Sequence, residues 1–150
     1  MGLRDELRIS VLADLRAGRD PLDGFYCDRS VKEQMLAVLL SGRHLLLDGP
    51  PGCGKTTLAR IIATLLPPAE FRRLCRYGCG PSDPVEHCPD CAHSLNHDAV
   101  VLPGAERFVR VQGSPELTPD DLVGSVDPLA ALRYGLRDPR AFDFAGGLAG

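Results

Sequence analysis

Apolar residues at helical spacing open the chain. They recur every four or five positions over residues 3–17, which predicts an amphipathic helix that ends before Gly18. Residues 18–24 are rich in Gly, Asp and Pro and are typical of a turn or linker. The helical pattern resumes at Ser30-Val31-Lys32-Glu33, which fits a capping box, and predicts a second helix that ends at Ser41-Gly42.

Two short apolar runs predict strands. Residues 44–48 form an apolar run bounded by turn residues, which is typical of a strand buried on both faces of a parallel sheet. A helix over residues 55–66 follows a Gly/Pro-rich loop and ends at Pro67-Pro68, since proline cannot continue it. Residues 106–112 predict a second strand. Thr118-Pro119-Asp120-Asp121 then predicts a helix start, with Thr as N-cap and acids in the first turn.

Residues 70–98 break this pattern, because they are rich in Cys, His, Pro, Asp and Gly and poor in branched apolar residues. Such a segment predicts an insertion held together by something other than a hydrophobic core. Its cysteines, Cys75, Cys79, Cys88 and Cys91, have the spacing C-x3-C-x8-C-x2-C. Two close pairs can place four thiolates at the corners of a tetrahedron, which Zn²⁺ prefers. We therefore expect a closed, structural zinc site that supplies folding energy.

Other interpretations of the cysteines stay open at this point. His87 or His93 could replace one thiolate, or the four cysteines could be free thiols or include a disulfide pair. Cys27 is far from the cluster in sequence and has no assigned role. His44 and His97 are interpreted as ordinary surface or strand-edge residues.

Composition and charge narrow the class of protein. With 150 residues and ordinary apolar and charged fractions of 44% and 25%, the chain can form one compact domain. A net charge of -3 argues against a general nucleic-acid or membrane-surface binder. No apolar run approaches the ~20 residues of a membrane span, and no signal-peptide core opens the chain. We expect a cytoplasmic protein, whose six cysteines are metal ligands or free thiols rather than disulfides.

The sharpest motif is Gly49-Pro50-Pro51-Gly52-Cys53-Gly54-Lys55-Thr56, which matches the P-loop pattern G-x-x-x-x-G-K-[ST] at every fixed position. The loop N–H groups and the start of the following helix predict a nest for a triphosphate. Lys55 is expected to reach the β- and γ-phosphates, and Thr56 to offer its hydroxyl to Mg²⁺. The alternative is a glycine-rich turn that binds nothing. Cys53 is interpreted as a small residue that fits the loop rather than a catalytic thiol, since no base or substrate pocket is visible.

Hydrolysis of ATP needs more than a P-loop. It requires an acidic strand end that holds Mg²⁺ and a group that orients water. No apolar strand ends in paired acids after residue 112, and Asp120-Asp121 lies at a predicted helix start. We therefore expect an N-terminal fragment of a longer ATPase, which alone could bind ATP without turnover.

Two segments resemble AAA+ ATPases. Residues 30–63 combine a helix, the run Leu45-Leu46-Leu47-Asp48 and the P-loop in that family's order. Residues 111–127, beginning Val111-Gln112-Gly113-Ser114-Pro115-Glu116, are similar to the MoxR and magnesium-chelatase I-subunit branch. The cysteine insertion between P-loop helix and second strand also resembles that of chelatase-type proteins.

The resemblance implies an α/β P-loop NTPase fold, with a three-layer parallel sheet covered by helices on both faces and the zinc-binding insertion at about residues 70–98. Residues 1–24 would be an N-terminal helix and linker, and residues 25–150 the first part of the AAA+ domain, truncated before the Walker B acids. Thr57 joins the nucleotide-binding residues, and residues 113–126 would form a loop that faces substrate or a neighbouring subunit. The usual Val-x-Gly-Gln box near the adenine is replaced by Phe25-Tyr26-Cys27-Asp28.

The implied activity is ATP hydrolysis by a ring, often a hexamer, that remodels a partner protein or inserts a metal into a tetrapyrrole. The partner is often a protein with a von Willebrand A domain. One alternative is a DNA-handling module of the clamp-loader type, against which the acidic balance and residues 113–127 argue. Another is a nucleotide-binding zinc adaptor without turnover.

Overall fold

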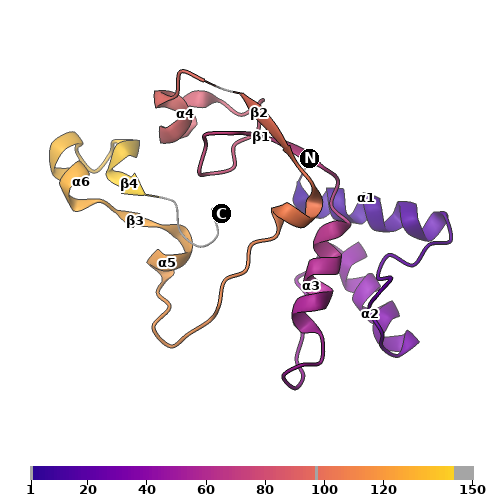
Figure 1. Ribbon diagram of the computed structural model, residues 1–150. Coiled ribbons are helices and arrows are strands. Elements are labelled where there is room, and N and C mark those ends of the chain that lie inside the picture. Colours follow the sequence, from indigo (N-terminus) through magenta and orange to yellow (C-terminus); the bar gives the residue numbers. More distant parts are fainter. Residues whose placement is uncertain (1, 97, 144–150) are drawn as a thin grey trace. The chain divides into compact units, whose positions relative to one another are not determined.

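The chain forms two units, and the computed structural model describes residues 2–96 and 98–143 (Figure 1). The first unit contains the chain up to Ala69 together with Leu102–Phe108, and the second contains Glu70–Val101 and the residues from Val109 on. The predicted flexible tail, residues 145–150, lies outside the described residues.

Three helices build the first unit: α1 (Leu3–Arg16), α2 (Arg29–Leu40) and α3 (Lys55–Thr64). The prediction for α1 is confirmed, including its end. Gly18 has a φ of 71°, and the Arg19 N–H beyond it donates to the Asp14 carbonyl at 2.9 Å. Glycine adopts this left-handed conformation without the penalty that a Cβ brings.

The core of the first unit forms where these helices meet. Leu22, Leu39 and Leu58 pack together, and none of them is more than 6% exposed. Leu22 comes from the turn between α1 and α2, so the predicted linker is also a core element. Partly buried side chains surround the three: Leu7, Phe25, Met35, Leu36, Leu45, Leu47, Ile61, Ile62 and Leu65.

A short return segment closes this unit against α3. The 3₁₀ turn η2 (Gly104–Arg107) packs on α3 so closely that a Cβ at Gly104 would lie 2.2 Å from the Leu66 carbonyl oxygen. Only glycine fits such a backbone approach. Arg107 then donates to the Glu6 carboxylate at 2.8 Å and to the Pro67 carbonyl at 2.9 Å, which fixes the segment to α1 and to the end of α3.

Both strands predicted from apolar runs are wrong. Residues 44–48 have no regular secondary structure, and no strand pairs with them among the described residues. Leu45 and Leu47 pack on the core, while Leu46 is 91% exposed. Residues 106–112 begin within η2 and continue without regular structure. A strand needs a hydrogen-bonded partner, and apolar pattern alone does not supply one. The predicted three-layer parallel sheet is accordingly not formed within residues 2–96 and 98–143.

The predicted capping box of the second helix is also wrong. Helix α2 begins at Arg29, with Asp28 as N-cap, so Ser30 lies inside the first turn. The Glu33 carboxylate accepts a bond from Arg29 Nε at 2.8 Å instead of closing a box with Ser30. The predicted end at Ser41-Gly42 is confirmed, since Ser41 is the C-cap and Gly42 has a φ of 66°.

The second unit is built from short elements around the cysteine segment. Strands β1 (Ala69–Arg72) and β2 (Ala99–Leu102) pair with each other. The chain between them carries the 3₁₀ turn η1 (Val85–His87) and helix α4 (Pro89–His93). Sequence patterns missed β2, although its run Ala-Val-Val-Leu is apolar.

The remainder of this unit contains a short antiparallel strand pair and two short helices. Helix α5 (Pro119–Val123) leads into β3 (Ser125–Val126), which pairs antiparallel with β4 (Phe142–Asp143); helix α6 (Pro128–Tyr134) and the turn η3 (Pro139–Ala141) lie between. The predicted start of α5 is confirmed. The Thr118 hydroxyl accepts the Asp121 N–H at 3.3 Å, and Asp121 accepts the Thr118 N–H at 2.8 Å.

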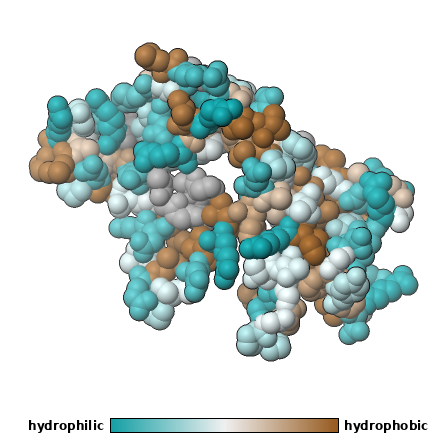
Figure 2. All heavy atoms as spheres, in the orientation of Figure 1, coloured by the Kyte–Doolittle hydropathy of each residue, from teal (hydrophilic) through white to brown (hydrophobic). Residues whose placement is uncertain are grey.

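Many large apolar side chains reach the surface. Figure 2 shows hydrophobic residues in brown among hydrophilic ones in teal on the visible face. In α6 the most exposed are Leu129, at 79%, and Leu132, at 87%, so this helix contributes little to a core. Over the part of the chain that the structure describes, no helix combines the length and apolarity needed to span a bilayer.

Candidate functional site

The P-loop connects residues 44–48, which have no regular secondary structure, to α3. Gly52 and Gly54 have φ values of 84° and 89°, in the left-handed region that glycine tolerates. Gly54 is the N-cap of α3, and the helix begins at Lys55. The first N–H groups of a helix have no partner within the helix, and together with the N–H groups of a glycine-rich loop they can bind an anion.

Lys55 closes on its own loop. Its ammonium group donates to the Gly49 carbonyl at 2.6 Å and to the Pro50 carbonyl at 2.8 Å, and lies 3.6 Å from the Cys53 sulfur. All three partners are loop atoms, and no carboxylate pairs with this ammonium among the described residues. The charge therefore stays inside the loop and available to an anion.

A cavity of about 540 Å³ opens at this loop. The sequence-predicted residues that line it are Gly49, Pro51, Gly52, Gly54, Lys55, Thr56 and Thr57. Both threonines are exposed, so their hydroxyls are accessible to a ligand or ion. Pro50 and Cys53 belong to the loop without lining this cavity. The structure thus brings the predicted loop residues together around one open space.

Sequence reasoning gave no role to Phe25, which supports the loop. A Cβ at Gly54 would lie 3.2 Å from the Phe25 ring, so this aromatic side chain packs directly against the loop glycine. The neighbouring Tyr26 is 95% exposed. Phe25 and Tyr26 stand where the family usually has a Val-x-Gly-Gln box. The Phe25 side chain packs against the loop, and the Tyr26 side chain is in solvent.

The four cysteines of the insertion converge. The sulfur atoms of Cys75, Cys79, Cys88 and Cys91 all lie within 4.8 Å of one another, and the Cys75 and Cys88 sulfurs are 3.6 Å apart. A tetrahedral ion with metal–sulfur bonds of ~2.3 Å separates its sulfurs by ~3.8 Å, so the cluster fits Zn²⁺ with small adjustments. Cys88 and Cys91 are 5% and 2% exposed.

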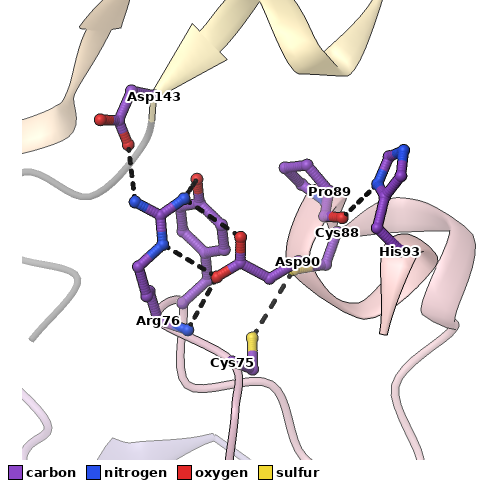
Figure 3. A network of polar contacts seen from close by, with 8 residues as sticks. Cys75, Arg76, Cys88, Pro89, Asp90, His93 and Asp143 are labelled. Carbon is purple, nitrogen blue, oxygen red and sulfur yellow. Dashed lines mark hydrogen bonds and ion pairs between the residues drawn. The ribbon is translucent and has the colours of Figure 1, made fainter. Parts of the chain in front are cut away.

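Among the described side chains, no histidine joins the four cysteines. His93 is exposed, and its Nδ1 donates to the Pro89 carbonyl at 2.7 Å, outside the group of converging sulfurs (Figure 3). The side chain of His87 and the whole of His97 lie outside the described residues. Cys27 and Cys53 are exposed free thiols apart from the cluster.

The environments of the thiols differ. Burial raises the pKa of Cys79 and of Cys88. Burial also acts to raise the pKa of Cys75, but the N–H groups of Cys79 and Tyr77 outweigh it and lower that pKa. These N–H groups favour the thiolate, which is the form of cysteine that binds a metal.

A bidentate ion pair ties the two cysteine pairs together. Arg76, next to Cys75, donates from its backbone N–H and Nε to Asp90 Oδ2, both at 3.0 Å, and from Nη2 to Oδ1 at 3.1 Å (Figure 3). Asp90 lies in the first turn of α4, between Cys88 and Cys91. The hydrogen bond from Arg76 lowers the pKa of Asp90, so the carboxylate stays charged.

Sequence reasoning also missed Arg72, the buried charged residue next to the cysteines. Only 6% of it is exposed. The nearby Cys91 sulfur is the main cause that raises the pKa of Arg72. Nothing in the run Phe71-Arg72-Arg73 distinguishes this arginine from its exposed neighbour, so no sequence signal marks it.

A second cavity, of about 750 Å³, lies within the second unit. Arg76 and Arg140 line it, but Arg76 is paired with Asp90, and Arg140 donates to the Asp138 carboxylate at 2.8 Å. Because its cations are neutralised locally, this cavity has no evident charge preference for a ligand.

Comparisons with known proteins agree on the class of this chain. Residues 26–77 match the family model described as magnesium chelatase, subunit ChlI. The Holliday junction branch migration complex subunit RuvB of Pseudarthrobacter chlorophenolicus is 38% identical over 82 residues, which is 50% of this chain and 21% of that protein. The RuvB of Acidothermus cellulolyticus is 38% identical over 93 residues, covering 57% of this chain and 23% of the relative. No solved structure matches.

These matches show an AAA+ ATPase module, the class that the motifs implied. The chain spans about a fifth of the length of the curated relatives it matches. The matches do not single out the MoxR branch.

Proposed function

We propose that this chain carries the ATP site of an AAA+ ATPase whose hydrolysis remodels a partner protein. The observation that carries the proposal is the open cavity lined by the P-loop backbone, Lys55, Thr56 and Thr57 at the start of α3. A triphosphate there would accept hydrogen bonds from the backbone N–H groups of Gly52, Gly54, Lys55 and Thr56, since Pro50 and Pro51 have none, and would lie at the positive end of the helix dipole.

Each loop side chain has a defined task in this proposal. Lys55 leaves the carbonyls of Gly49 and Pro50 and bonds phosphate oxygens, which attract an ammonium group more strongly than neutral carbonyls do. Thr56 supplies a hydroxyl to Mg²⁺, which neutralises phosphate charge when bound. The Phe25 ring packs against Gly54 and holds its backbone in place. Hydrolysis requires an acidic metal ligand and a water-orienting group in the parent protein.

Two observations support a remodelling function. They are the match of residues 26–77 to the family model and the similarity of residues 111–127 to the MoxR and chelatase branch. In this proposal the parent assembles into a hexameric ring and acts on a protein with a von Willebrand A domain, or drives metal insertion. The four-cysteine cluster holds one structural Zn²⁺, because four converging sulfurs leave no open coordination position.

A second candidate is work on nucleic acid. The relatives are named as subunits of a Holliday junction branch migration complex. Their similarity weakens the expectation, drawn from the net charge of -3, that nucleic acid is not a partner. In this alternative, the same ATP site drives movement of a DNA junction.

Substitution of one lysine tests the ATP site. The sequence holds two lysines, Lys55 in the loop and Lys32 on α2. We expect Lys55→Ala to weaken binding of a fluorescent ATP analogue about 10- to 150-fold, since hydrogen bonds to charged groups contribute ~1.5–3 kcal/mol. Lys32→Ala is the matched control and should leave affinity unchanged. Equal affinity of wild type and Lys55→Ala would refute the assigned site.

The two functions differ in what stimulates turnover. The ATPase rate of the full-length parent is measured alone, with a synthetic four-way DNA junction, and with a von Willebrand A domain protein. Stimulation by the protein and not by the junction supports remodelling, whereas strong stimulation by the junction supports the second candidate.

A further inference from the structure

Arg72 is a buried cation whose charge has no carboxylate partner. It lies at the end of β1 and is 6% exposed. Its Nη2 donates to the Pro81 carbonyl at 3.1 Å and to the Asp83 carbonyl. Among the described residues no ion pair joins it to a carboxylate, and its Nη1 is buried without a hydrogen-bond partner. Burial of a charge that nothing balances is strongly unfavourable.

No water molecule can hydrate the buried guanidinium from the hollow beside it. Arg72 lines a small hollow together with Cys75, Asp90 and Cys91, and that hollow has no room for a water molecule. The Asp90 carboxylate in its wall is held by Arg76, and the Asp83 carboxylate by the Gly80 N–H at 2.7 Å. The Asp83 charge acts on Arg72 more weakly than the Cys91 and Cys79 sulfurs do and forms no ion pair with it, so the cysteine sulfurs are the main groups that can balance the guanidinium.

The backbone of Arg72 belongs to the same cluster. Its N–H donates to the Cys79 carbonyl at 2.8 Å, and its own carbonyl accepts the Cys75 N–H at 3.1 Å. One residue therefore positions the first cysteine pair through its main chain. Its side chain lines the same small hollow as Cys91 of the second pair.

We propose that Arg72 is the counter-ion of the four-cysteine metal centre and positions the Cys91 thiolate. The inference rests on the zinc site of the proposed function. Four thiolates on a divalent ion leave two negative charges in a buried place, and the guanidinium offsets one of them while bonding to sulfur. A metal-free cluster with protonated thiols leaves the same cation unbalanced. Arg72 thus favours the metal-bound form over the empty one.

The test compares Arg72→Met, Arg72→Lys and Arg73→Met in the full chain. Arg73→Met is the matched control, because Arg73 is adjacent and exposed. Zinc affinity is measured by competition with a chromophoric chelator, and Co²⁺ is used as a spectroscopic probe of the sulfurs. We expect Arg72→Met to bind zinc about 10- to 100-fold more weakly, the usual cost of losing an outer partner of a metal ligand.

Two further readouts separate this role from simple structural support. The sulfur-to-cobalt charge-transfer band should move to lower energy in Arg72→Met, because the thiolate loses a positive hydrogen-bond donor, and should be largely restored in Arg72→Lys. The metal-free Arg72→Met protein should be as stable to heat as metal-free wild type, or more so, since a buried unbalanced charge has been removed.

The possible results distinguish a failure of the role of Arg72 from a failure of the metal centre. Wild-type affinity and band position in Arg72→Met, or equal losses in Arg73→Met, would overturn the role of Arg72 while the metal centre stands. Lower stability of metal-free Arg72→Met would also overturn it, because a structural prop is lost equally in both forms. Wild type that takes up no zinc or cobalt would remove the centre itself.

Discussion

The first unit buries apolar side chains, whereas the second buries mainly sulfur and charge. In the first, the residues with less than a tenth of their surface exposed include Val11, Leu22, Leu39, Leu58 and Ala63. Gly104 of η2 is also buried and belongs to the first unit. In the described part of the second unit, the residues with so little exposed surface are Cys88, Cys91, Ala141 and Arg72. The two units are of similar length, but different interactions offset the conformational entropy that each loses on folding.

This difference bears on function. Burial of an aliphatic side chain stabilises the folded state by ~1.5–3 kcal/mol without any bound ion. The core of the first unit, which carries the P-loop, therefore needs no ligand to fold. The cysteine segment lacks such a core and instead converges four sulfurs and ties them with Arg76 and Asp90. Its order is therefore expected to depend on an ion, and that dependence can be tested separately from nucleotide binding.

Removal of metal should have the largest effect and should strike one unit only. Structural zinc supplies ~10–16 kcal/mol of apparent folding free energy in small zinc modules. We expect a strong chelator, or Cys88→Ser, to abolish amide hydrogen-exchange protection over residues 75–93 and to leave α3 protected. Exchange is followed peptide by peptide with mass spectrometry.

The control for this experiment is Cys27→Ser, which alters an exposed thiol away from the cluster and should change nothing. Protection of residues 75–93 that survives both chelator and Cys88→Ser would mean that the second unit has another source of stability. Loss of protection in α3 as well would mean that the two units fold as one.

A core truncation should give the reciprocal result with a smaller effect. Leu58 is fully buried in α3, directly after the P-loop. Leu58→Ala should destabilise the first unit by ~2–5 kcal/mol through lost burial and a residual cavity, with exchange of α2 and α3 accelerated and residues 75–93 unchanged. Leu46→Ala, at a position 91% exposed, should change stability by less than ~0.5 kcal/mol. Equal effects of the two substitutions would contradict the assigned core.

Local signals in the sequence predicted one part of this structure well. Helix periodicity, the stop at Gly18 and the cap at Thr118 depend on residues within a few positions of one another, and all three are found. The cysteine cluster was equally predictable, because ligand spacing is itself the physical constraint. Most of the residues that the P-loop motif assigned to the nucleotide, but not Pro50 and Cys53, line one cavity, while their binding of nucleotide stays a prediction.

Partners distant in sequence could not be predicted. Residues 44–48 carry a strand pattern, but pairing requires a neighbour that the pattern does not name. Arg72 is buried by the turn at Pro81 and Asp83 and by Cys91, so its burial follows from the fold of the insertion and not from its own surroundings in the chain. The same holds for Phe25 against Gly54.

The smallest expected effect concerns charge in the apolar unit. Lys32 Nζ donates to Asp20 Oδ2 at 2.6 Å, and Asp20 Oδ1 accepts the N–H of the buried Leu22 at 2.9 Å. The hydrogen bond from Lys32 lowers the pKa of Asp20 below its ordinary value. The pair therefore stabilises the folded state above the unfolded-state pKa of Asp20, and this contribution is lost as the pH falls through the lower folded-state pKa.

Because both side chains are partly exposed, the pair should contribute no more than ~1 kcal/mol. Asp20→Asn should lower the midpoint of thermal unfolding of the first unit slightly at pH 7, and its difference from wild type should shrink as the pH falls through the lowered folded-state pKa of Asp20. Arg29→Ala removes a more exposed ion pair, with Glu33, and should have a smaller effect at pH 7. A loss at pH 7 as large as that of Leu58→Ala would show that charge, and not apolar burial, dominates the support of the P-loop, and the contrast between the two units would fail.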